Sequence, residues 1–409
     1  MQFQQTTLSN GLCVVAEVNP TAKSLAAGFF VRTGSRDETP EVAGVSHFLE
    51  HMVFKGTDRR TALDVNLEFD RMGAQYNAFT GEETTVYFAA VLPEFQAACL
   101  DLLCDILRPS LRQEDFDVEK GVIQEEIAMY DDLPHFRLHE TIMSRHFDSH
   151  PLGNAILGTK QSVAAMKRDD MRAYFDRRYS PGNVTLVGVG NLDFDAFASQ
   201  AEALCSSWKP FQADRSREPC DGTKTHDSIV DEKLSRQNLG LMSPAPSYQD
   251  EQCFAAQVLS TVLGDSTGSR LFYALIETAL ADEAHTAYSG MDGVGVFYTF
   301  ASTAPEAAGR VLDIIRREFK KFLDEGPTDA ELQAAKNKIA SQATLKGEQP
   351  MGRLVSVGFD WMYRGRYEPL AQQIERIFAV TGEQVLQLAR RYDIASATTL
   401  SLGPTAVTG

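Results

Sequence analysis

The stretch His47-Phe48-Leu49-Glu50-His51 decides how the rest of this chain is interpreted. On a helix, positions i, i+3 and i+4 share one face, so His47, Glu50 and His51 point the same way. Neutral imidazoles bind Zn²⁺ well, and a carboxylate beside them can take a proton from a metal-bound water, whose pKa falls from 15.7 to about 7. The order His-x-x-Glu-His inverts the commoner His-Glu-x-x-His, and both patterns are typical of metal-dependent hydrolases.

An ordinary amphipathic helix is the alternative interpretation of this stretch. Val45, Leu49 and Met52 recur at helical spacing and form an apolar stripe suited to a core. The two interpretations differ in what else the chain must contain, because a catalytic zinc ion usually has three protein ligands and one open position. A third ligand must therefore come from another part of the sequence.

The best candidate for that ligand lies in a second predicted helix, Asp115–Met129, whose apolar residues also recur at helical spacing. Glu119 and Glu126 are seven residues apart and share one face of this helix, whereas Glu125 is rotated by about 100° from Glu126. One of these acids could bind a metal while the other orients it. A solvated acidic face is the alternative.

The family resemblance follows from these residues together with further segments along the chain. The sequence resembles the pitrilysin family of inverted-motif zinc peptidases, close to the branch that contains the mitochondrial processing peptidase. The likeness spans nearly the whole chain and is most specific in the first half. The matching segments are Leu8–Leu12, Gly44–Gly56, Gly73–Thr80 with Thr85 and Tyr87, Glu119–Met129, His150–Leu152 with Ile156–Thr159, Tyr179–Asn183 and Ser269–Phe272.

The resemblance implies a role for each residue of the motif. His47, His51 and Glu126 would be the ligands of a Zn²⁺ cofactor, and Glu50 would be the general base. Glu119 matches an acid that supports the ligand histidines or the charge of the site, and we group it with Glu50 as catalytic. Imidazole and carboxylate ligands also suit cobalt or manganese, so the sequence does not fix the metal.

A substrate-docking element is also implied by the resemblance. Asn77, Ala78, Phe79 and Thr80 match an edge strand that binds substrate in this family. An extended peptide can add to such an edge through main-chain hydrogen bonds, which do not depend on its sequence. For Asn77 and Thr80, ordinary strand and turn chemistry is the alternative.

Other histidines and cysteines carry a weaker signal. His135 and His139 are also four residues apart, but Leu138 stands where a base would be required, so we interpret them and His146 as surface or packing residues. Six cysteines show no Cys-x-x-Cys spacing, and we expect free thiols in a reducing compartment; they are Cys13, Cys99, Cys104, Cys205, Cys220 and Cys253.

Composition and charge narrow the class of protein. A length of 409 residues predicts two or more domains, and 39 basic against 56 acidic side chains give a net charge of −17. That charge disfavours nucleic acid and anionic membranes as partners. The sequence has no apolar run of about 18 residues, and Met1–Gln5 does not begin a signal peptide. We therefore expect a cytoplasmic protein that begins at Met1.

An internal duplication predicts the domain organisation. Leu92–Leu103 resembles Ala304–Ile315, and each segment follows a strand-like run. The predicted domains are a zinc-binding peptidase domain at 1–208, a linker at 209–226 and a related domain without a metal site at 227–409. The second half has no histidine helix, and Gln342 falls near the counterpart of Glu126. The expected fold class is α+β, with two related halves that each pack a mainly antiparallel sheet with helices.

One departure from the family pattern predicts a partner. Active two-domain relatives carry an Arg four residues after the Ser-Arg-Leu-Phe motif and then a Tyr, and this pair contacts the substrate and the transition state. Here Ile276 replaces the Arg, and Tyr288 arrives several residues late. We expect a related peptidase-family subunit to supply the missing half-site in a heterodimer. A homodimer is the alternative, with Tyr288 or Arg270 serving instead.

The predicted function is therefore that of a zinc-dependent metalloendopeptidase. Its substrates would be peptides or unfolded segments held extended in a chamber between the two halves. Two alternatives stay open: a non-catalytic binding or assembly subunit, resembling the core subunits of respiratory complexes, and a maturase that cuts one specific precursor peptide.

Overall fold

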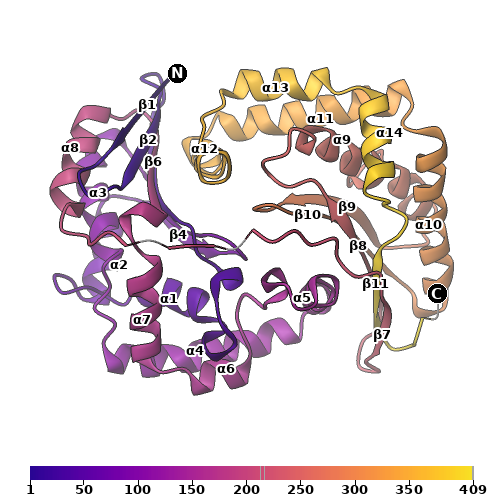
Figure 1. The fold of residues 1–409 in the computed structure, drawn as a ribbon, viewed down its shortest axis with the longest axis horizontal. Helices are drawn as coiled ribbons and strands as arrows, with labels where there is room; N and C mark the ends of the chain where they lie inside the picture. Colours follow the sequence, from indigo (N-terminus) through magenta and orange to yellow (C-terminus); the bar gives the residue numbers. More distant parts are fainter. Residues whose placement is uncertain (212, 216, 408–409) are drawn as a thin grey trace. The chain divides into compact units, whose positions relative to one another are not determined.

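Two compact units make up the protein in the computed structural model, which describes residues 1–211, 213–215 and 217–407 (Figure 1). The first unit contains residues 1–128, 154–216 and 346–368. The second unit contains residues 129–153, 217–345 and 369–409. Each unit is built around its own β-sheet, and the family's expected fold class of two similar halves is confirmed.

The sheet of the first unit has the strand order β1-β2-β6-β3-β5-β4 and is antiparallel except for the parallel pair β2 and β6. The central strand β3 is buried along its whole length, because helices cover both faces of the sheet. The strands are β1 Gln2–Thr7, β2 Cys13–Val18, β3 Leu25–Val31, β4 Gln75–Thr80, β5 Thr85–Val91 and β6 Val184–Gly190.

The helices of the first unit pack on the two faces of this sheet. Alternation along β3 and β6 sends Phe30 and Val187 towards α12, whereas Gly188 on the opposite face lies against Phe197 of α8. The helices are α1 Val45–Val53, α2 Ala62–Arg71, α3 Gln96–Ile106, α4 Gln113–Asp131, α6 Lys160–Ala165, α7 Arg168–Arg178, α8 Phe194–Cys205 and α12 Pro350–Arg364.

The sheet of the second unit repeats this plan with the order β7-β11-β8-β10-β9, again with a single parallel pair, β7 and β11. Strand by strand it matches the first sheet without β1. Its elements are β7 His226–Val230, β8 Gln237–Ala245, β9 Glu283–Gly290, β10 Gly295–Thr303, β11 Thr398–Gly403, α5 Pro134–Phe147, α9 Cys253–Gly264, α10 Ala308–Glu325, α11 Asp329–Gly347, α13 Leu370–Ala379 and α14 Gly382–Arg391.

Each unit contains one helix that comes from the other half of the sequence. Helix α5 follows α4 in the first half, yet Leu138 and Ile142 pack against Met242 and Phe300 of the second sheet. Helix α12 comes from the second half and packs on the first sheet. The compact units are therefore not contiguous in sequence. The domain boundaries expected at 1–208, 209–226 and 227–409 describe the repeated halves and stay a prediction.

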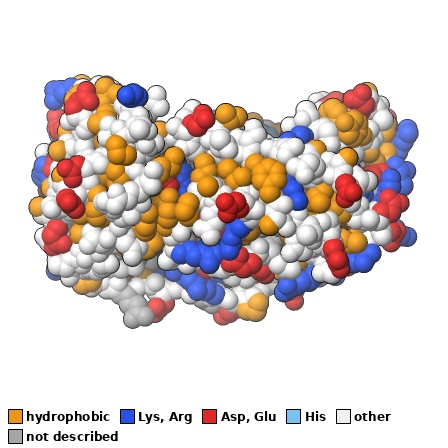
Figure 2. Space-filling view, turned by 90° about the horizontal axis from the view of Figure 1, so that it is seen from above, with side chains coloured by type: hydrophobic (Ala, Val, Ile, Leu, Met, Phe, Trp, Pro, Cys, Tyr) orange, Lys and Arg blue, Asp and Glu red, His pale blue; other side chains and the backbone are white. Residues whose placement is uncertain are grey.

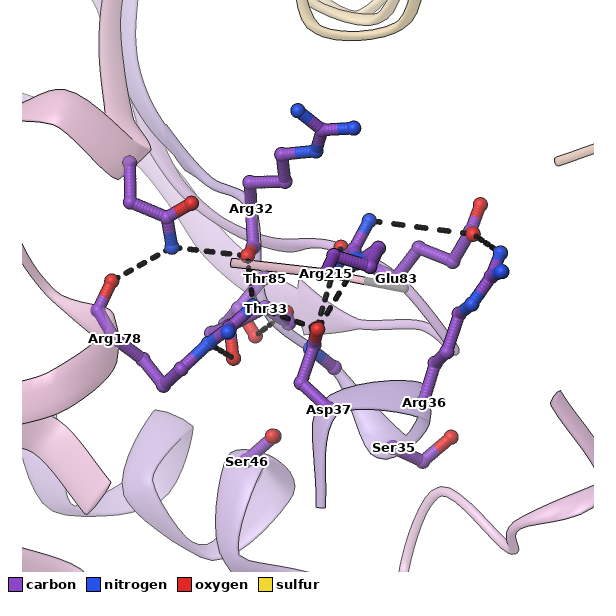
Figure 3. A network of polar contacts seen from close by, with 12 residues as sticks. Arg32, Thr33, Ser35, Arg36, Asp37, Ser46, Glu83, Thr85, Arg178 and Arg215 are labelled. Atoms are coloured by element: carbon purple, nitrogen blue, oxygen red, sulfur yellow. Dashed lines mark hydrogen bonds and ion pairs between the residues drawn. The ribbon is translucent and has the colours of Figure 1, made fainter. Parts of the chain in front are cut away.

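A buried charge network anchors the expected linker to the first unit (Figure 3). Arg215, within that linker, places a guanidinium nitrogen 2.5 Å from Asp37, and Arg178 places one 2.6 Å from the same carboxylate. Arg36 binds Glu83 at 2.6 Å. Because Glu83 lies in the turn between β4 and β5, the network also fixes this hairpin. Gln212 and Ser216 of the linker lie outside the described residues.

The surface shows no separation of charge on the face drawn in Figure 2, where Lys and Arg side chains lie among Asp and Glu side chains. Proteins that bind nucleic acid usually gather basic residues on one face. The described side chains on this face do not follow that pattern. Within the described ranges, no helix has both the length and the apolar character needed to cross a membrane.

Candidate metal centre

Helix α1 presents the sequence motif from a firmly held N-terminus. Glu38 accepts hydrogen bonds of 2.7 Å from the backbone N–H groups of Gly44 and Ser46, which caps the start of the helix. Gly44 has φ +91°, and a Cβ there would lie 2.4 Å from the carbonyl oxygen of Leu157. Because Phe48 and the other apolar residues of α1 are buried, the motif residues occupy its remaining face.

The two histidines of α1 meet a carboxylate of α4. The Nε2 atoms of His51 and His47 lie 3.4 Å and 3.8 Å from Oε2 of Glu126. One candidate ligand atom from each of the three residues lies within 4.8 Å of the others, and no second such cluster occurs among the described residues. Two atoms bound tetrahedrally to one zinc ion at 2.0–2.1 Å lie about 3.3 Å apart, so the residue types suit zinc and the two separations from Glu126 are close to those of a zinc site.

Glu119 lies behind one of these histidines. Its Oε1 atom is 2.8 Å from Nδ1 of His51 and can accept a hydrogen bond from it, and the other ring nitrogen, Nε2, lies nearer Glu126. Its Oε2 atom is 2.6 Å from Nζ of Lys55. Burial works to raise the pKa of Glu119, but the bonds from His51 and Lys55 outweigh burial and lower it. The sequence had not singled out Lys55, although it stands four residues after His51.

Burial sets the protonation of the other motif residues. It lowers the pKa of His47 to about 3, helped by the neighbouring His51, so the His47 ring is neutral and able to bind a metal. Burial also raises the pKa of Glu50. Burial would lower the pKa of His51, but its contacts with Glu119, Glu126 and Glu50 raise it.

Thr80 reaches Glu50 directly. The Oγ1 hydroxyl of Thr80, the last residue of β4, donates to Oε2 of Glu50 at 2.5 Å. The sequence had placed Thr80 only on a substrate-docking strand. The two residues are 30 positions apart, one on a helix and one on a strand. Their spacing in the sequence therefore gives no indication that they touch.

Strand β4 is an edge strand, as predicted. It pairs with β5 on one side and is the last strand of its sheet as described. Asn77 is exposed and bonds the N–H of Ala78, which is buried. Phe79 is half-buried and packs beside Phe88. The substrate-binding role of Asn77, Ala78, Phe79 and Thr80 stays a prediction.

The counterpart region of the second unit holds no candidate metal cluster within the described residues. Helix α9 stands where the histidine helix would be and is almost wholly buried. Gln342 is exposed on α11. Of the other histidines, His135 is exposed, His139 packs edge-on against Tyr298, and His146 is buried.

The residues that could replace the missing Arg and Tyr have other contacts. Arg270 binds the carboxylate of Glu331 at 2.8 Å and lies over the ring of Phe322. The hydroxyl of Tyr288 donates to the carbonyl oxygen of Pro246 at 2.9 Å. Ile276 packs against the core of the second unit.

Comparison with known proteins agrees with this geometry. The family model described as Insulinase (Peptidase family M16) matches residues 13–160, and the model described as Peptidase M16 inactive domain matches residues 165–339. The chain is 33% identical over 397 residues to a Streptomyces coelicolor protein named an uncharacterized zinc protease. The alignment covers 95% of this chain and 86% of that protein.

Solved structures share the fold. A protease from Helicobacter pylori matches with a TM-score of 0.90 and 20% identity over 98% of this chain and 99% of its own. A chain of complex III2 from Candida albicans matches with a TM-score of 0.86 and 17% identity, and the match covers 98% of this chain and 96% of that chain. Such low identities establish the architecture alone. The two family models and the Streptomyces relative show that the chain belongs to peptidase family M16, the pitrilysin family.

Proposed function

We propose that this chain is a zinc-dependent endopeptidase in which His47, His51 and Glu126 hold the metal. The observation that carries the proposal is the meeting of two imidazoles and a carboxylate from α1 and α4, with one candidate ligand atom from each within 4.8 Å of the others. The hydrogen bond from His51 to Glu119 adds the support that metal-binding histidines usually have. The name of the Streptomyces relative agrees with this metal.

The chemistry assigned to the chain centres on Glu50. Bound zinc would acidify a water and polarise the carbonyl of the peptide bond. Glu50 would accept the proton of the attacking water and pass it to the departing amine. Thr80 would hold one oxygen of Glu50 and leave the other for this proton transfer. Glu119 and Lys55 would keep the His51 ring in the correct tautomer and orientation.

Extended peptides or unfolded segments are the proposed substrates. An extended chain could pair with the outer edge of β4, next to the strand residue that contacts Glu50. Main-chain pairing of this kind would accept substrates of many different sequences. The enclosing chamber and the cytoplasmic location expected from the sequence stay predictions.

We also propose that a related subunit completes the site. A cation and a phenol aimed at the developing oxyanion are often worth about 10²-fold or more each. Arg270 and Tyr288 are bound elsewhere in the second unit, which favours a heterodimer over a homodimer. If the purified chain alone cleaves unstructured peptides at about 1 s⁻¹ or faster, typical of enzymes, and its mass is that of a single kind of chain, the heterodimer is wrong.

Two measurements test the peptidase proposal. Metal analysis of the purified chain should find one zinc per chain in the wild type and in Glu50→Gln, and none in His47→Ala. Cleavage of an unstructured peptide, by the chain or by the complex it forms in its source cells, should fall about 10²–10⁴-fold in Glu50→Gln. The exposed His135→Ala is the control and should match the wild type. Zinc in His47→Ala, or full turnover in Glu50→Gln, would overturn the assignment.

The second candidate function is a non-catalytic assembly subunit, and the fold shared with a chain of complex III2 favours it. Retention of all four motif residues argues against it. Zinc bound without cleavage of any peptide, in the chain and in its native complex, would favour this alternative. Cleavage restricted to one partner peptide would instead favour the maturase.

A further inference from the structure

Two cysteines far apart in sequence lie side by side in the first unit. Cys104 on α3 and Cys205, the last residue of α8, have their Sγ atoms 3.5 Å apart. The two helices pack against each other on one face of the sheet (Figure 1). The side chains are 3% and 0% exposed. Cys99, the other cysteine of α3, has no such sulfur contact within the described residues.

A cavity gives small molecules a route to this pair. It has a volume of about 680 Å³ and is bordered by Cys104, Arg108, Arg172, Tyr179 and Trp208, among others. Cys104 therefore faces the cavity, and Cys205 lies directly behind it. A molecule the size of a peroxide needs far less space than this, since a water occupies about 30 Å³ of liquid.

Burial and the nearby Arg108 have opposite effects on the ionisation of the Cys104 thiol. The Arg108 guanidinium lies 3.5 Å from the centroid of the Trp208 ring and donates to the carbonyls of Leu107 and Tyr179. Among the described residues no carboxylate forms an ion pair with it, and its charge interacts with both sulfurs and with Asp176. Burial, the neighbouring Cys205 and Asp101 raise the pKa of the Cys104 thiol well above its usual range, and Arg108 opposes this more weakly. The thiolate is therefore scarce, and oxidation is expected to be slow.

We propose that Cys104 and Cys205 form an oxidisable dithiol site, in which hydrogen peroxide converts the two thiols into a disulfide that links α3 to α8. The Cys104 sulfur attacks one peroxide oxygen, the O–O bond breaks, and the other oxygen leaves as water with the thiol proton. The resulting sulfenic acid is attacked by the Cys205 sulfur, and its oxygen leaves as a second water. Two thiols lose two electrons, and one peroxide becomes two waters.

The geometry allows this bond with little movement. A disulfide has an S–S length of about 2.05 Å, so the two sulfurs must approach by about 1.5 Å. The closed loop spans the residues between 104 and 205 and includes α4 with Glu119 and Glu126. Cross-linking a loop of this length restricts the unfolded chain strongly, and we expect the thermal midpoint to rise by roughly 5–15 °C.

Peptide mapping of the full-length chain tests the site. Wild type and Cys99→Ala are treated with hydrogen peroxide or with dithiothreitol and digested without reduction. Cys99 is the matched control, because it is also buried on α3 but has no sulfur beside it within the described residues. Both proteins should become two hydrogen atoms lighter and yield the Cys104–Cys205 cross-linked peptide. Cys205→Ala should yield none, and dithiothreitol should reverse the midpoint shift.

Contrary results are equally clear. Loss of the cross-link in Cys99→Ala, sulfinic acid on Cys104 without a cross-link, or no change of mass under prolonged peroxide would each overturn the proposal. A cross-linked chain whose midpoint does not rise would overturn the stabilising effect. Circular dichroism of Cys205→Ala checks that the variant has folded, and Cys104→Ala serves as its replacement if it has not.

Discussion

At the scale of single residues, the hydroxyl of Thr80 contacts the proposed base as well as lying on the proposed docking strand. Its 2.5 Å hydrogen bond to Glu50 ties the edge strand to the proposed base. A residue that only bound substrate would affect KM, whereas one that orients the base would affect kcat. The two roles of Thr80 can therefore be separated by kinetics.

We predict that Thr80→Val lowers kcat by roughly 10-fold and leaves KM within about twofold, because a hydrogen bond to a charged group is worth about 1.5–3 kcal/mol. Thr80→Ser retains the hydroxyl and should keep most of the activity. Steady-state kinetics on one peptide gives both constants. A rise in KM at constant kcat in Thr80→Val would assign the residue to substrate docking instead.

Glu119 offers a second test at this scale. We predict that Glu119→Gln weakens zinc binding by 10–100-fold, because the amide cannot hold both His51 and Lys55 as the carboxylate does. Competition with a chelator measures the zinc Kd. Glu125→Gln removes an exposed acid from the same helix and should leave the Kd unchanged. Equal loss in both variants would mean that only the overall charge of α4 matters.

Residue-level predictions could be made from the sequence where spacing along one helix carries the information. The i, i+4 histidines and the shared face of Glu119 and Glu126 follow from helical geometry, and the fold brings these residues together. Contacts between different elements left no such signal. The bond from Thr80 to Glu50, and the sulfur pair separated by 101 positions, depend on tertiary packing.

At the scale of elements, α5 illustrates how a helix is held by the sheet it packs on. His146, near its end, is 1% exposed, and Nδ1 lies 3.1 Å from Oγ1 of Thr398 on β11. Burial lowers the pKa of His146 to about 4. The folded state thus holds this ring neutral, whereas the unfolded chain protonates it near its usual pKa of 6.5.

Stability should therefore fall as the pH drops from about 6.5 to about 4, because the unfolded state binds an extra proton over this range. The loss from His146 amounts to roughly 3 kcal/mol at most. Urea unfolding at several pH values measures it. In His146→Asn the difference from the wild type should shrink towards pH 4, and the exposed His135→Asn controls for loss of a histidine. A difference that is constant with pH would contradict the buried neutral ring.

Element boundaries were predicted well where apolar patterning is strong. The expected helix Asp115–Met129 lies within α4, which extends two residues further at each end. The assignment of helices to sheets could not be predicted in the same way. Helices α5 and α12 each pack on the sheet of the other half, and their amphipathic patterns specify an apolar face without specifying its partner.

At the scale of the whole molecule, two related units divide the chemistry unequally. Both keep the same strand order, which confirms the duplication inferred from the sequence. Within the described residues only the first unit gathers side chains that could hold a metal ion. In the second unit, Arg270 binds Glu331 and Tyr288 bonds the carbonyl oxygen of Pro246. Because both side chains have these contacts, we expect full activity to require a second subunit.

The most direct measurement is anomalous X-ray diffraction at the zinc edge from crystals of the protein grown with one equivalent of zinc. We predict one ion bound by His47, His51 and Glu126 at about 2.0–2.2 Å from each ligand atom. Zinc found only at other residues, or no zinc peak near these three side chains, would contradict the assignment of this site.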